Sequence, residues 1–102
     1  MIKIYGMPSC PDCHFVEEQV QGDARYEVIN IGDKDGDHIL HLKAFLRLRD
    51  REAIFDEAKA HGFAGIPCFV LEDGTVTLTP EEAGLKSRPL EGVACSIDGS
   101  GC

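Results

Sequence analysis

The sequence contains no tryptophan, few aromatic residues and no long hydrophobic run. Aromatic residues make up 7% of its 102 residues. No apolar run approaches the ~18 residues of a membrane-spanning helix, which excludes an integral helical membrane protein. The first residues, 1–6, lack a basic stretch followed by an apolar one, so we expect no secretory signal and a cytoplasmic location.

Basic residues are also scarce. Ten Lys and Arg face 18 Asp and Glu, which gives a formal net charge of −8. This balance argues against a nucleic-acid ligand and against an anionic membrane surface, since both bind through clustered cations. The one basic row, Lys43, Arg47 and Arg51, has the spacing of a single helix face. It could dock an acidic partner or be a solvated face paired with Glu52 and Asp56.

A chain of this length has room for one domain. Patterns of apolar residues and turn signals predict the element order β-α-β-α(α)-β-β-α. The expected fold class is α/β: a four-stranded mixed sheet with flanking helices, in which the first two strands are parallel and the last two form a hairpin. The predicted strands are residues 2–5, 26–31, 66–71 and 75–78, and the predicted helices start at residues 11, 38 and 80. Asp73-Gly74 is a two-residue hairpin turn signal between the last two strands.

Two helix boundaries are predicted with particular detail. The helical stretch 38–61 has a predicted break at Asp50 and Arg51, which leaves one bent helix or two helices as alternatives. The last helix has a capping-box pattern, with Thr79 as N-cap and Glu82 three residues on. Residues 1–87 then form the domain, and the Pro- and Gly-rich residues 88–102 form a weakly ordered tail.

The most informative motif is Cys10-Pro11-Asp12-Cys13, which follows a predicted strand and opens a predicted helix. The positive end of a helix dipole favours the thiolate of Cys10, and Cys13 lies one turn on, within disulfide reach. Cys10 should therefore attack a disulfide, and Cys13 should resolve the mixed disulfide. The negative charge of Asp12 opposes that thiolate, so Asp12→Asn should lower the Cys10 pKa.

Two other interpretations of the motif are a zinc half-site and a pair of inert cysteines. A zinc site needs about four ligands. The remaining cysteines are Cys68, Cys95 and Cys102, and the sequence has no second C-x-x-C. Because the motif offers too few ligands for zinc, we favour redox chemistry and assign no metal ligand.

The Cys-Pro-Asp-Cys motif, the strand–helix order and Gly65-Ile66-Pro67, which opens the third predicted strand, together resemble the glutaredoxin branch of the thioredoxin-like superfamily, over residues 1 to about 85. The resemblance implies a thioredoxin-like fold and a monomeric thiol–disulfide oxidoreductase that reduces protein or glutathione mixed disulfides without a required cofactor. It implies that Pro67 is cis and that the Ile66 backbone contacts the substrate thiol, with Pro11 and Asp12 also at the substrate site.

The sequence departs from that family at two places. Met7, Pro8 and Ser9 stand where a basic residue usually precedes the first cysteine, and residues 77–82 replace a Gly-Gly and acidic pair that holds glutathione. The electron donor therefore stays open between glutathione and a reductase, with glutathione as an alternative co-substrate. An iron–sulfur or other metal-binding module, and a non-catalytic module that binds partners through Lys43, Arg47 and Arg51, are the alternative functions.

Three further cysteines have open roles. Cys68 follows Pro67 and is either a third redox thiol or a buried small apolar residue. Cys95 and Cys102 lie in the predicted tail. They could form a second disulfide that relays electrons, bind a metal, or remain two unpaired thiols.

Overall fold

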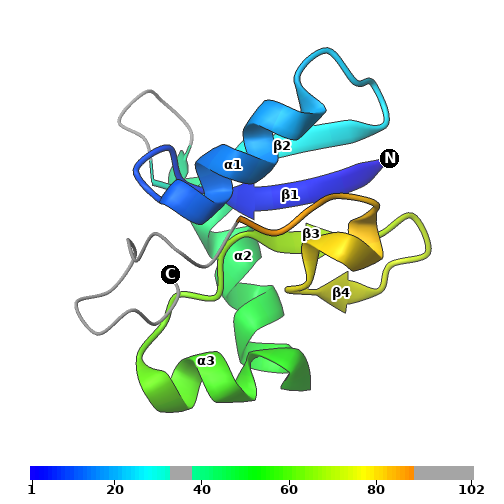
Figure 1. Cartoon of the computed structure of the whole chain (residues 1–102). Coiled ribbons are helices and arrows are strands. Elements are labelled where there is room, and N and C mark those ends of the chain that lie inside the picture. Colours follow the sequence, from blue (N-terminus) through cyan, green and yellow to red (C-terminus); the bar gives the residue numbers. More distant parts are fainter. Residues whose placement is uncertain (33–37, 89–102) are drawn as a thin grey trace.

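The computed structural model describes residues 1–32 and 38–88, which form a four-stranded mixed sheet with helices on both faces. The sheet order is β2-β1-β3-β4 (Figure 1). Strand β1 pairs in parallel with β2 and antiparallel with β3, and β3 pairs antiparallel with β4. These pairings confirm the predicted mixed sheet. The strands are β1 Ile2–Gly6, β2 Tyr26–Asn30, β3 Cys68–Val70 and β4 Val76–Thr77.

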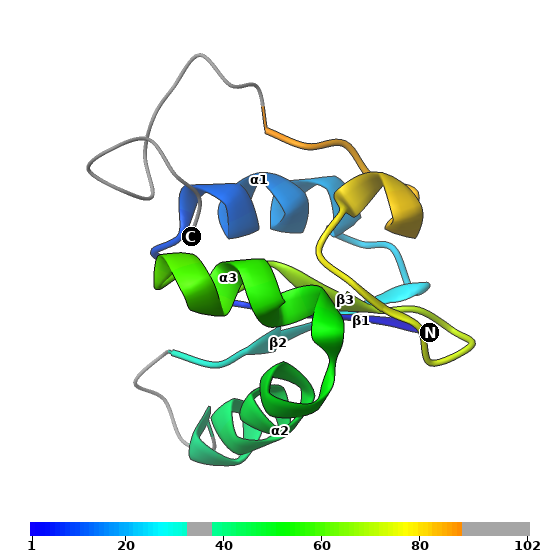
Figure 2. The same cartoon turned by 90° about the horizontal axis from the view of Figure 1, so that it is seen from below.

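The helices lie on opposite faces of this sheet. Figure 2 shows α1 and the 3-10 helix η2 on one face and α2 on the other. None of the helices within the described ranges is both long and apolar enough to cross a membrane. The helical elements are α1 Pro11–Val20, α2 His38–Arg51, η1 Ala53–Phe55, α3 Asp56–His61 and η2 Pro80–Ala83.

The pleat of the strands divides the core into two clusters, because successive side chains point to opposite faces. Ile4 packs under α1, and the neighbouring Tyr5 packs toward α2, where its ring lies 6.1 Å from that of Phe45. The cluster under α1 consists of Ile4, Val16, Val20, Phe69, Ala83 and Leu85. The cluster on the other side contains Tyr5, Ile29, Ile31, Phe45, Phe55 and Ile66, together with the buried cysteines Cys10, Cys13 and Cys68.

The stretch 38–61 forms two helices, which decides between the two alternatives. The first ends at Arg51, and Glu52 has an extended backbone. The break turns the chain so that Phe55 is fully buried and packs edge-on against Phe45, with 5.7 Å between ring centroids. Burial of the Phe55 ring favours the bent arrangement over one continuous helix. At the other end of α3, Gly62 adopts the left-handed conformation expected of a C-cap.

The predicted capping box at Thr79 is wrong. Residues 80–83 form a single 3-10 turn, and the Thr79 side chain caps no backbone N–H. Instead the Thr79 N–H donates to the hydroxyl of Thr77 at 3.1 Å, and Tyr26 donates to the Ala83 carbonyl at 2.8 Å. One local and one tertiary hydrogen bond thus hold this short turn, and the segment is not a full helix because Gly84 ends it after Ala83.

The third and fourth strands are shorter than predicted. Strand β3 begins at Cys68, since Pro67 has no N–H to donate to the ladder. Strand β4 covers only Val76–Thr77. The connecting turn at Asp73 and Gly74 is where the sequence predicts it, and Gly74 has the positive φ of 90° that the turn requires.

Gly65 offers a test of how tightly the loop before β3 is packed. Its φ is +95°, and an added Cβ would lie 2.7 Å from Cδ1 of Phe55. We expect Gly65→Ala to lower the free energy of unfolding by about 3 kcal/mol, from backbone strain plus overpacking. Urea denaturation measures it.

Gly22→Ala is the matched control. Gly22 also has a positive φ, +76°, but an added Cβ would meet nothing within 4 Å. Gly22→Ala should therefore lower the free energy of unfolding by only about 1 kcal/mol, from backbone strain alone. Equal losses in the two variants would contradict the packing argument.

Candidate functional site

Cys10 and Cys13 lie together at the start of α1, just after the carboxyl end of β1. Cys10 is the N-cap residue, with an extended backbone, and its sulfur accepts a hydrogen bond from the Cys13 N–H at 3.4 Å. Pro11 occupies the first helical position, where its missing N–H costs nothing. The helix start therefore orients both sulfurs, as the motif predicts.

The two thiols have opposite acidities. The Cys13 thiol donates a hydrogen bond to the Cys10 sulfur, and this is the main reason that the pKa of Cys10 is lowered to about 7. Backbone N–H groups of Cys13 and Asp12 lower it further, while burial and the Asp12 charge act in the opposite direction. The same hydrogen bond and burial raise the pKa of Cys13. Near neutral pH the thiolate is therefore favoured at Cys10 over Cys13, and Cys13 keeps its proton.

Both cysteines are buried, but to different depths. Cys10 is 6% exposed and Cys13 is 0% exposed. Gly6 of β1 makes room for Cys13, because a Cβ at Gly6 would lie 2.9 Å from the Cys13 sulfur. Cys10 is therefore the thiol of the pair that an incoming disulfide can reach.

The segment before β3 meets this cysteine pair. The Ile66–Pro67 peptide bond is cis, which confirms that expectation. Ile66 is buried in the same cluster as Cys10 and Cys13. Arg49 of α2 fixes the preceding loop by donating to the carbonyls of Phe63 and Ala64, at 2.8 and 2.9 Å. The contact of the Ile66 backbone with a substrate thiol stays a prediction.

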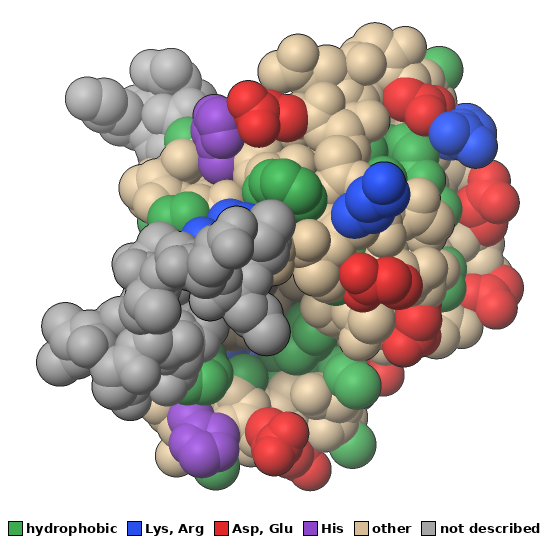
Figure 3. All heavy atoms as spheres, viewed as in Figure 1, with side chains coloured by type: hydrophobic (Ala, Val, Ile, Leu, Met, Phe, Trp, Pro, Cys, Tyr) green, Lys and Arg blue, Asp and Glu red, His purple; other side chains and the backbone are tan. Residues whose placement is uncertain are grey.

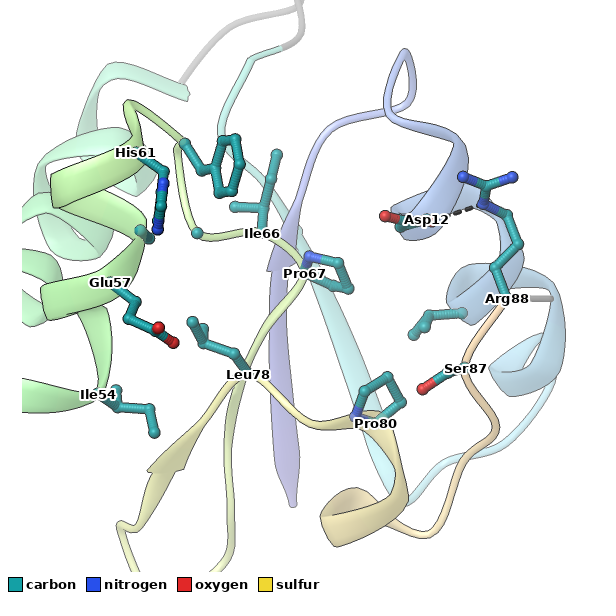
Figure 4. Close-up of a pocket in the computed structure, with 14 residues that line it drawn as sticks. Asp12, Ile54, Glu57, His61, Ile66, Pro67, Leu78, Pro80, Ser87 and Arg88 are labelled. Carbon is teal, nitrogen blue, oxygen red and sulfur yellow. Dashed lines mark hydrogen bonds and ion pairs between the residues drawn. The ribbon is translucent and has the colours of Figure 1, made fainter. Parts of the chain in front are cut away.

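A cavity of about 660 Å³ is lined by Asp12 of the cysteine motif, Ile66 and Pro67, while neither Cys10 nor Cys13 is among the residues that line it. Figure 4 shows one wall formed by α3 and the opposite wall by α1 and the segment that follows η2. Pro67 and Leu78 lie between the two walls, and Asp12 of the motif lies at the rim. The structure thus brings Asp12, Ile66 and Pro67 around one hollow.

Arg88 is the residue of this site that the sequence did not identify. It forms an ion pair with Asp12, and both side chains are largely shielded from solvent (Figure 4). Hydrogen bonds between Gln19 and the backbone of Lys86, at 2.8 and 2.9 Å, hold the segment that leads to it. The composition places residue 88 in the predicted tail, and a lone arginine there gives no signal of this contact.

The remaining cysteines are Cys68, Cys95 and Cys102. Cys68 is completely buried, and burial raises its pKa to about 12, so its thiol keeps its proton at neutral pH. Such a thiol packs as a small apolar residue. Cys95 and Cys102 lie outside the described residues.

The described residues also bear on the two alternative interpretations, a metal site and a partner-binding surface. Within residues 1–32 and 38–88, no group of three or more His, Cys, Asp or Glu side chains is arranged to hold a metal ion. Lys43, Arg47 and Arg51 are exposed on α2, and Arg51 pairs with Glu52 at 3.3 Å.

The fold and the cysteine pair define a mixed α/β protein with a dithiol at a helix N-terminus. A protein of Haemophilus influenzae (strain ATCC 51907 / DSM 11121 / KW20 / Rd), described as uncharacterized, is 39% identical over 71 residues. The match covers 69% of this chain and 78% of that protein, and the chain belongs to the same family. No protein-family model matches the sequence. No solved structure matches it either.

Alkylation by iodoacetamide tests the acidity of Cys10. In the reduced protein we expect Cys10 to react with a midpoint near pH 7, while Cys13 and Cys68 react slowly because they are buried and protonated. Cys13→Ala removes the hydrogen bond that contributes most, so the midpoint should rise. Peptide mapping by mass spectrometry assigns each site. A midpoint unchanged by Cys13→Ala would contradict the shared-proton arrangement.

Variants of the Asp12–Arg88 ion pair test how nearby charges affect the Cys10 pKa. Arg88→Ala leaves the Asp12 charge uncompensated, so the Cys10 pKa should rise; Asp12→Asn should lower it. At pH 6 the two changes should move the alkylation rate in opposite directions, each by about two- to threefold. Arg25→Ala, which breaks the exposed Asp23 pair, is the control and should leave the rate unchanged. Shifts of the same sign in the two site variants would contradict the ion-pair account.

Proposed function

We propose that this protein is a thiol–disulfide oxidoreductase with a thioredoxin-like, glutaredoxin-related fold. The observation that supports it best is the hydrogen bond from Cys13 to Cys10, which lowers the Cys10 pKa to about 7 beside the cis Pro67. The sheet order β2-β1-β3-β4, with the dithiol after β1 and the cis proline before β3, agrees with the proposed fold.

The reaction is two successive thiol–disulfide exchanges. The Cys10 thiolate attacks one sulfur of the substrate disulfide, and the other substrate sulfur leaves as a thiolate and takes up a proton. A mixed disulfide then joins Cys10 to the substrate. Cys13 loses its proton and attacks the Cys10 sulfur, which releases the second substrate thiol. The substrate gains two electrons and two protons, and the protein is left with a Cys10–Cys13 disulfide.

The acidities of the two cysteines suit these two steps. In the first step Cys10 is ionised and Cys13 protonated, so only one sulfur of the pair is nucleophilic. Once Cys10 is bonded to the substrate, it no longer shares the Cys13 proton. The pKa of Cys13 then falls from its raised value, because the neighbouring negative charge has gone. The resolving thiol is thereby activated only after the first step.

A thiol donor must return the pair to the dithiol form. Either two molecules of glutathione or a dithiol reductase can supply the two electrons. The substrates proposed at this level are disulfide-containing proteins and glutathione mixed disulfides.

Turnover of a small mixed disulfide tests the proposal. We expect activity with dithiothreitol, and with at least one of two enzymatic donors: glutathione plus its reductase, or thioredoxin reductase. Cys10→Ser should abolish it, because no thiolate then begins the exchange. With substrate but no added thiol, Cys13→Ser should retain the mixed disulfide on Cys10, visible as added mass.

Cys68→Ser is the matched control, because Cys68 is buried and protonated and should not exchange. It should retain turnover. Activity that survives Cys10→Ser, or no activity with any donor, would overturn the proposal and turn attention to the metal-module and binding-module alternatives.

A further inference from the structure

The cavity that Pro67 and Asp12 line is mainly apolar. Figure 3 shows hydrophobic side chains around a hollow on this face of the molecule. They come from several elements of the fold. Its apolar lining includes Val16, Ile54, Ile66, Pro67, Leu78 and Pro80. We call this hollow the Pro67 groove.

The charged residues of the Pro67 groove are few and mostly acidic. Asp12 and Arg88 neutralise one another at one wall. Glu57 extends into the groove from α3 on the other wall, with His61 one turn on (Figure 4). Among the residues that line it, Arg88 is the only Lys or Arg, and Asp12 already engages it. The paired charges cancel, and Glu57 leaves the groove with one negative charge.

The rest of the C-terminal segment cannot reverse this balance. Residues 89–102 contain no Lys, Arg or His, whatever conformation they adopt. They include two acids, Glu91 and Asp98, so this segment adds negative charge only.

A glutathione mixed disulfide and a protein disulfide present different charges to such a groove. Glutathione has two carboxylates and one ammonium group, so it needs cations to hold it. A peptide segment has an uncharged backbone, and its apolar side chains remove apolar surface from water when they enter the groove. A basic side chain on that segment would be attracted to Glu57, as charge complementarity requires.

We propose that the Pro67 groove binds a peptide segment of a protein disulfide, with an apolar side chain next to the reacting cysteine and a basic one beyond it, in preference to glutathione. This inference rests on the proposed function, whose substrate class it narrows. The apolar side chain lies against Leu78 and Ile54, and the basic one reaches Glu57. Because Glu57 is exposed, its contribution is salt-dependent.

Three disulfide probes of similar size test the inference, each reduced with dithiothreitol as the donor. All are mixed disulfides with 2-mercaptoethanol: one of glutathione, one of a short peptide whose cysteine is flanked by Leu and Lys, and one of the same peptide with Glu in place of Lys. We expect kcat/KM for the Leu/Lys peptide to exceed that for glutathione by about tenfold, and the Glu peptide to fall between them.

Two pairs of variants separate groove contacts from general charge and surface effects. Glu57→Lys should reduce kcat/KM for the Leu/Lys peptide by about fivefold and raise it for glutathione. Its control is Glu27→Lys, the same change at an exposed position of β2, which is the edge strand farthest from β4. Ile54→Ser should reduce kcat/KM for both peptides by about fivefold. Its control is Ile39→Ser, since Ile39 and Ile54 are 58% and 47% exposed and only Ile54 lines the groove.

The outcomes distinguish the two proposals. The inference is overturned if turnover depends on Cys10 but the glutathione probe is preferred. It is also overturned if Glu57→Lys and Ile54→Ser leave kcat/KM unchanged. Either result leaves the oxidoreductase proposal intact. No Cys10-dependent turnover of any probe overturns both. Peptide preference that is lost in the two groove variants and kept in the two controls supports the inference.

Discussion

One hydrogen bond, from the Cys13 thiol to the Cys10 sulfur, governs the chemistry of this protein. It exists because Cys10 is the N-cap of α1 and Cys13 lies one turn on, so the helix start fixes the two sulfurs relative to each other. The bond places one shared proton on Cys13, which lowers the pKa of Cys10 and raises that of Cys13. The rest of the site preserves this asymmetry: Gly6 leaves space for Cys13, and burial disfavours a second thiolate next to the first.

The sheet supplies the rigid frame that this asymmetry requires. Strand β1 is central and pairs with both β2 and β3, so it holds the cysteine loop and the cis Pro67 segment at adjacent ends of neighbouring strands. Arg49 adds a second restraint, because its guanidinium fixes the carbonyls of the loop before Ile66. A nucleophile and its proposed substrate surface are therefore positioned by different elements packed on one core. The 3-10 turn η2 continues into the segment that places Arg88 beside Asp12.

Much of this arrangement could be predicted from local sequence signals. The Cys-Pro-Asp-Cys motif sets its own helix N-terminus, alternation of apolar residues marks β1, and Asp73-Gly74 marks the hairpin, because each signal acts over a few residues. The cis Pro67 was predicted through a resemblance and not from its neighbours. The capping box at Thr79 was wrong because the Thr79 N–H donates to the hydroxyl of Thr77, and Tyr26, distant in the sequence, holds the end of that turn. The Asp12–Arg88 pair could not be predicted, since 76 residues separate its members and nothing local indicates that they meet.

That unpredicted pair connects the nucleophile to the proposed groove. Asp12 adds a negative charge beside Cys10, which by itself opposes the thiolate. Arg88 offsets that charge, and the same contact leaves the groove without a cation for a carboxylate ligand. A single ion pair thus offsets a charge that opposes the thiolate and, in our proposal, disfavours glutathione. The two effects follow from one placement of charge, so a sequence that lost Arg88 would be expected to change both together. The net charge of −8 acts in the same direction, because it repels anionic disulfides before they reach Cys10.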